Sequence, residues 1–95
     1  MTTLYLVASL TAIPGREAEL KQVLLDLRGP SRADDGCLQY DLHADRENPR
    51  HFLFFESWRD ETSWRAHMET PHLKDFNARS GDLVESWVLH QLDRL

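Results

Sequence analysis

The chain has 95 residues, of which 41% are hydrophobic and 28% are charged, and its formal net charge is −5. This size and composition predict a single globular domain over residues 1–95, small enough to gain stability from a partner subunit. The negative charge, with arginines spread singly and no basic stripe, excludes nucleic acid as an expected partner.

The features that report on the cell compartment favour the cytoplasm. Cys37 is the only cysteine, so no intrachain disulfide can form. The N-terminal segment lacks a basic start, and the most apolar run, residues 52–55, is far shorter than a membrane span. We therefore expect no membrane partner. Cys37 itself is predicted to be a small buried hydrophobic residue, with a nucleophile as the alternative.

The first strand and helix follow from two different periodicities. Residues 3–12 alternate between two sets of side chains, which predicts a strand that ends at a Pro-Gly pair. Apolar residues then recur at helical spacing and form one stripe, at Leu20, Val23, Leu24 and Leu27. The pair Gly29-Pro30 is expected to end this helix or to leave one further turn after it.

Two further strands are predicted to pair as an antiparallel hairpin. Residues 37–45 alternate again, and residues 51–58, HFLFFESW, form the third strand. An Asn-Pro pair between them marks the turn. Asp60 is then expected to cap a second helix that extends through Met68.

The remaining segment predicts a short helix and a last strand. Pro71 breaks the second helical segment, and a third helix carries Leu73 and Phe76 and ends near Gly81. Residues 84–92 form the last strand. The resulting order is βαββαβ with the second α element split. This order predicts an α+β ferredoxin-like fold, in which helices cover one face of a four-stranded antiparallel sheet.

The third strand is apolar on both faces. Phe52, Phe54 and Trp58 point one way, whereas Leu53 and Phe55 point the other. An antiparallel sheet with one wet face alternates apolar and polar residues, and the helices can cover only one face. We therefore expect a homodimer that packs sheet against sheet. The alternative is a monomer with a few exposed aromatic residues.

Four segments together resemble the antibiotic biosynthesis monooxygenase family: PG-x-E behind the first strand, GCLQYDLHAD, FESW and AHMETPHLKDF. The resemblance covers essentially the whole chain and is closest to the small quinol-monooxygenase-like branch. It implies a dimeric α/β barrel with one pocket per subunit, between the sheet and the second helical region. Some members oxygenate polycyclic phenols or quinols with O2 and without metal or flavin, some degrade heme, and at least one isomerises a quorum signal.

The heme-degrading branch is the poorest match. That branch uses an Asn on the first strand, and a Trp and a His around the second helical segment. His67 stands where this Trp would be, Asn77 stands near the position of this His, and the first strand has no Asn. Heme is therefore not the expected substrate.

His67 and His72 lie five residues apart, which on one continuous helix separates them by roughly 140°. A helical metal pair requires a spacing of three or four, so no metal site is predicted. His67 shares a helix face with Trp64 and is expected to act as an acid–base group in an apolar pocket. The alternative is a core histidine bonded to the backbone. His72 is expected to cap a helix, line the pocket or lie on the surface.

Glu56 shares its strand face with aromatic residues, so it requires a partner or a raised pKa. It is therefore either paired with an arginine, or a base or hydrogen-bond anchor. Tyr40 and Trp58 are expected to stack a flat ligand, or else to be core residues. Trp64, Phe76 and His72 complete the predicted substrate contacts.

These observations predict a cofactor-independent monooxygenase that oxidises a small quinol or polyketide phenol with O2. His67 is the first candidate base and Glu56 the second. Two other functions remain open. One is an isomerase or detoxifying enzyme for a small reactive metabolite, and the other is a non-catalytic dimer that binds a small molecule.

Overall fold

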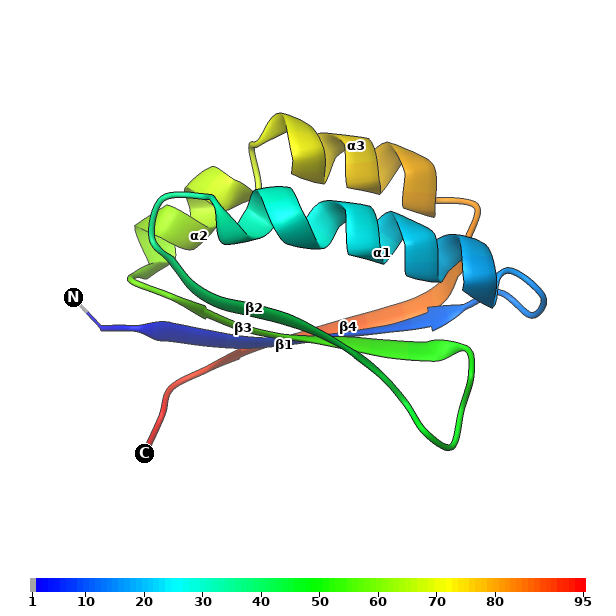
Figure 1. The fold of residues 1–95 in the computed structure, drawn as a ribbon. Coiled ribbons are helices and arrows are strands. Elements are labelled where there is room, and N and C mark those ends of the chain that lie inside the picture. The colour runs from blue at the N-terminus through cyan, green and yellow to red at the C-terminus, as the bar shows by residue number, and fades with distance from the viewer. Residues whose placement is uncertain (1) are drawn as a thin grey trace.

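The computed structural model describes residues 2–95 and contains a four-stranded sheet and three helices. The elements follow in the order β1 (Leu4–Ala12), α1 (Glu17–Arg32), β2 (Cys37–Ala44), β3 (His51–Trp58), α2 (Glu61–His67), α3 (Pro71–Ser80) and β4 (Val84–Leu92). The antiparallel sheet has the strand order β2-β3-β1-β4. All three helices lie on one face of it (Figure 1). The predicted ferredoxin-like α+β fold is confirmed.

The strand register sends alternate side chains to the helix-covered face and to the outer face. Leu6 on β1 lies opposite Glu56 on β3 at the covered face, and the next pair, Val7 and Phe55, lies at the outer face. The core therefore consists of one face of the sheet and the apolar sides of the helices. Its most buried large members are Leu6, Leu20, Leu24, Phe54 and Trp58.

Helix α1 continues through Gly29-Pro30 and ends at Arg32, the longer of the two endings that the sequence allowed. Pro30 lies in the last turn, where the N–H that it lacks removes only one hydrogen bond near the helix end. A proline ring disfavours helical backbone at the preceding residue partly by contact with its Cβ, and Gly29 has none. The added turn brings Ser31 into a fully buried position.

Helices α2 and α3 are separate because the hydroxyl of Thr70 caps both the end of α2 and the start of α3. Thr70 is the N-cap of α3: its hydroxyl accepts a hydrogen bond from the N–H of Leu73 and donates one to the carbonyl of His67. Pro71 occupies the first turn, where its missing N–H costs nothing. Asp60 caps α2 as predicted, since it accepts a 2.7 Å bond from the N–H of Ser63.

The loop between α1 and β2 packs closely against α2. Gly36 in this loop has a φ of +82°, a conformation that L side chains rarely adopt. A Cβ at this position would overlap the hydroxyl of Ser63. Glycine therefore lets the loop lie against α2, and Asp34, two residues earlier, is held beside the end of that helix. No helix within residues 2–95 is long and apolar enough to cross a membrane.

Candidate functional site

A cavity of about 490 Å³ lies between the covered face of the sheet and the helices α2 and α3. Most of its lining is apolar and comes from β1, β4 and the helices. Five of the seven predicted site residues line it: Tyr40, Glu56, Trp64, His67 and Phe76. The sequence missed Trp87 on β4, which also lines the cavity although its side chain is 67% exposed. The feature that could have identified Trp87 is a tryptophan on an edge strand of the sheet, where no predicted element covers it.

Glu56 is a buried carboxyl group on this wall, with 5% of its surface exposed. Its Oε1 accepts a 3.0 Å hydrogen bond from the indole Nε1–H of Trp58. Burial raises the pKa of Glu56 to about 7, although the Trp58 bond partly opposes this shift. No arginine within residues 2–95 pairs with it. Glu56 thus exchanges a proton near neutral pH.

His67, the last residue of α2, is 3% exposed. Its ring lies 4.6 Å from the ring of Trp58 and 5.5 Å from that of Tyr40, measured between centroids. Burial lowers the pKa of His67, and the neighbouring carboxylate of Asp34 only partly offsets the effect. The imidazole is therefore neutral at pH 7 and able to accept a proton.

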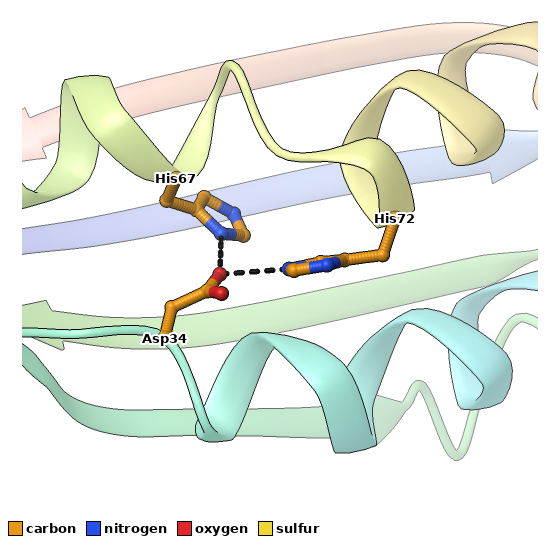
Figure 2. A group of neighbouring side chains, drawn as sticks. All are labelled: Asp34, His67 and His72. Atoms are coloured by element: carbon orange, nitrogen blue, oxygen red, sulfur yellow. Dashed lines mark hydrogen bonds and ion pairs between the residues drawn. The ribbon is translucent and has the colours of Figure 1, made fainter.

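Asp34, in the loop after α1, joins the two histidines of the candidate site (Figure 2). Its Oδ2 lies 2.7 Å from Nδ1 of His67 and 2.8 Å from Nε2 of His72. The spacing of five residues did not separate the two rings, because the chain breaks between α2 and α3 and both face the same carboxylate. In the sequence, Asp34 is marked only as one of two acidic residues before a glycine.

The same cluster bears on metal binding. The expectation of no metal site was based on the spacing of the two histidines, but the structure brings both of them to the carboxylate of Asp34. The three donor atoms lie within 4.8 Å of one another and are of the kinds that bind zinc. However, the 2.7 and 2.8 Å separations are hydrogen-bond lengths, shorter than the spacing of roughly 3.3 Å between ligands that bind zinc tetrahedrally at about 2 Å. The cluster as it stands is a hydrogen-bonded network.

Trp58 and His72 do not line the cavity, so of the two roles expected for Trp58 the structure favours a core residue over one that stacks a ligand. Trp58 is fully buried behind the wall, where it contacts both Glu56 and His67. His72 points at Asp34 from the first turn of α3. Both residues therefore contact the predicted acid–base groups rather than the cavity itself.

Cys37 is half-buried at the start of β2, so the predicted burial is only partial. Burial raises the pKa of its thiol to about 11, which leaves almost no thiolate at neutral pH. A nucleophilic role for Cys37 therefore has no support from its surroundings.

A second cluster, on the outer face of the sheet, combines the residue types of a hydrolase triad. The Nδ1–H of His51 donates a 2.9 Å bond to Asp45, and its Nε2 accepts a short bond from the hydroxyl of Ser9. Acyl transfer also requires N–H groups that stabilise an oxyanion. Strand β1 is paired on both sides of Ser9, with Leu53 and with Val88, so its backbone is already engaged in the sheet. Among residues 2–95, the backbone at Ser9 therefore offers no free N–H for an oxyanion.

Residues 3–79 match the sequence model of a family described as antibiotic biosynthesis monooxygenase. The chain belongs to this family. The crystal structure of PA3566 from Pseudomonas aeruginosa, 41% identical, superposes on it with a TM-score of 0.96 over 100% of this chain and 96% of that one. YcnE of Bacillus subtilis, whose name marks it as a candidate monooxygenase, is 32% identical over 77% of each chain.

The family assignment confirms the predicted resemblance and the kind of fold.

A further relative is longer than this chain. An uncharacterized Synechocystis protein, sll1783, is 38% identical over 58% of this chain, and the match spans 37% of that longer protein. The description of the family and the name of YcnE indicate oxygenase chemistry for the family and leave the substrate open. The geometry of the cavity, and not these names, therefore bears on the roles of individual side chains.

Proposed function

We propose that the protein is a cofactor-independent monooxygenase that oxidises a small quinol or polyketide phenol with O2. The supporting observation is that a neutral buried histidine, His67, and a buried carboxyl group, Glu56, line one largely apolar cavity. Such a cavity admits a flat, uncharged aromatic ring and keeps water away from it. Trp64, Phe76 and Tyr40 supply aromatic surface around that ring.

In the proposed reaction, His67 removes a proton from a phenolic hydroxyl group. The electron-rich anion then reduces O2 directly, and a carbon–oxygen bond forms on the ring. For a hydroquinone the products are a hydroxyquinone and water: one oxygen atom enters the ring and the other leaves as water. All four electrons come from the substrate. Glu56 serves as the second proton acceptor, or in its protonated form as a donor to the substrate oxygen.

The test is oxygen uptake by the purified protein with a panel of hydroquinones and polycyclic phenols. His67→Gln is expected to lower kcat by about 10²-fold or more, the usual contribution of a general base. The control is Lys74→Gln, at an exposed position on α3 away from the cavity and from the outer face of the sheet. Uptake by His67→Gln at the wild-type rate would show that the base is wrongly assigned. Turnover without oxygen would indicate an isomerase, and a bound aromatic that is never converted would indicate a binding protein.

We also propose that the protein works as a homodimer in which two sheets pack by their outer faces. The helices cover only one face of the sheet (Figure 1), and the outer face carries apolar side chains from three strands. These include Val7, Phe55, Val88 and Leu92, of which Val88 is 50% and Leu92 41% exposed. A second copy offers an apolar surface of the same kind to cover them.

A further inference from the structure

We propose that Asp34 is the positioning residue that makes His67 a base, and that His72 holds Asp34 in place for this purpose. The inference rests on the proposed function of His67. Nothing in the sequence pattern assigns Asp34 a role, and the three residues come from three separate elements, the α1–β2 loop, α2 and α3.

The contact between Asp34 and His67 determines which ring nitrogen faces the substrate. An ionised carboxylate only accepts hydrogen bonds, so the nitrogen 2.7 Å from Oδ2, Nδ1 of His67, carries the hydrogen. In a neutral imidazole the other nitrogen, Nε2, then holds the lone pair. Among residues 2–95 this nitrogen has no hydrogen-bond partner, and His67 lines the cavity. Asp34 therefore leaves Nε2 free to accept a substrate proton.

The same contact stabilises the charge that forms during the reaction. When Nε2 takes a proton, a positive imidazolium appears at a position that is only 3% exposed, where burial disfavours it. The carboxylate of Asp34 lies against that ring and offsets the charge. Without it, the proton would be harder to accept and the rate would fall.

The surroundings of Asp34 keep its carboxylate available to the two histidines. Three other charged groups lie around it: Asp35, Arg59 and Asp60. Arg59 is engaged by the other two carboxylates, at 3.1 Å from Asp35 and 3.6 Å from Asp60. His72 donates the second bond to the same oxygen of Asp34 from the first turn of α3. This bond fixes the side chain of Asp34 between α2 and α3.

The experiment combines the tautomeric state of His67 with kinetics. Long-range ¹H–¹⁵N NMR spectra of the wild-type protein are expected to show the hydrogen of His67 on Nδ1. Asp34→Asn is expected to shift the tautomer population and to lower kcat at least tenfold, with KM changed less than about threefold. Asp35→Asn is the matched control, because this neighbouring carboxylate is 89% exposed and bonds Arg59 rather than a histidine.

The tautomer of His67 and the rate of Asp34→Asn together decide whether Asp34 positions the base. A wild-type spectrum with the hydrogen of His67 on Nε2 overturns the inference whatever the activity, and so does an Asp34→Asn variant with unchanged tautomer and rate. If Asp34→Asn does not fold, His72→Leu provides the test, with a smaller loss of kcat and a mixed tautomer expected. Absence of oxygen uptake by the wild-type protein with every phenol would refute the proposed function, while the NMR result would still report on Asp34.

Discussion

The indole Nε1–H of Trp58 donates a 3.0 Å hydrogen bond to Oε1 of Glu56. The ring of the same tryptophan lies 4.6 Å from the ring of His67. One fully buried side chain on β3 thus supports both candidate acid–base groups from behind the cavity wall. Its hydrogen bond lowers the pKa of Glu56 and partly counters the effect of burial.

Replacement of Trp58 by phenylalanine is expected to raise the pKa of Glu56 above its present value of about 7. The variant keeps an aromatic ring but removes the only hydrogen bond to this carboxylate among residues 2–95. The pKa is measured by ¹³C NMR of the Glu56 carboxyl carbon during a pH titration. Trp87→Phe, at the exposed tryptophan on β4, is the control and should leave this pKa unchanged. A pKa that stays constant or falls in Trp58→Phe contradicts the assignment.

Glu56→Gln is expected to stabilise the protein at alkaline pH and to change little at acid pH. The folded-state pKa of about 7 lies above the ordinary value of 4.5, so the folded state binds the proton more tightly. Wild-type stability is therefore highest below pH 4.5 with respect to this group, and it is lost as the pH rises towards 7. A pKa shift of this size corresponds to about 3 kcal/mol of unfolding free energy. The variant keeps this stability at high pH because glutamine does not ionise.

Urea unfolding of wild type and Glu56→Gln at a series of pH values from 4 to 8 measures this difference. The free energy of unfolding of the variant should rise relative to that of wild type between about pH 5 and 7. Glu47→Gln, at an exposed carboxylate in the turn between β2 and β3, is the control for the loss of a surface charge. Parallel curves for wild type and Glu56→Gln would mean that Glu56 is ionised in the folded protein with an ordinary pKa.

Gly36→Ala is expected to destabilise the protein by at least about 1–2 kcal/mol, the usual cost of left-handed backbone at a residue with a Cβ. The added methyl group would also overlap the hydroxyl of Ser63, so the loop that carries Asp34 would move away from α2. Activity should therefore fall together with stability. Gly81→Ala is the control, because φ is −54° there and the nearest atom is 4.0 Å away. Equal stabilities for the two variants would contradict this account.

The fold was predictable because its signals are local. Strands β3 and β4 have the predicted bounds, 51–58 and 84–92, since alternation and turn residues define both ends. The sequence left two possible ends for α1, because the effect of Pro30 depends on its position in the last turn and on the glycine before it.

The candidate site was predictable only where a side chain belongs to a regular element. His67 and Glu56 stood out as polar residues on apolar faces, and both line the cavity. Asp34 lies in a loop 33 residues before His67 in the chain, and no periodic pattern marks a loop residue that tertiary packing brings to a site. Trp58 was predicted on the correct face, but its depth depends on how the helices pack over the sheet.

The proposed dimer predicts that one charge on the outer face of the sheet will produce monomers. Phe55 points outward from β3 beside Val7 of β1, near the centre of the four-stranded sheet. Phe55→Lys would bury an ammonium group between two apolar sheets, a cost that association cannot offset without a partner charge. Because the position is half-exposed in the single subunit, the fold itself should persist.

Sedimentation velocity at micromolar concentration distinguishes the two states. The wild-type protein should sediment as about 22 kDa, twice the 11.1 kDa of one chain, and Phe55→Lys as a single chain. Arg46→Lys, at an exposed site in the turn after β2, keeps the charge and should remain a dimer. Wild-type protein that sediments as one subunit would refute the dimer, because the outer face of its sheet would then be exposed to solvent without aggregation.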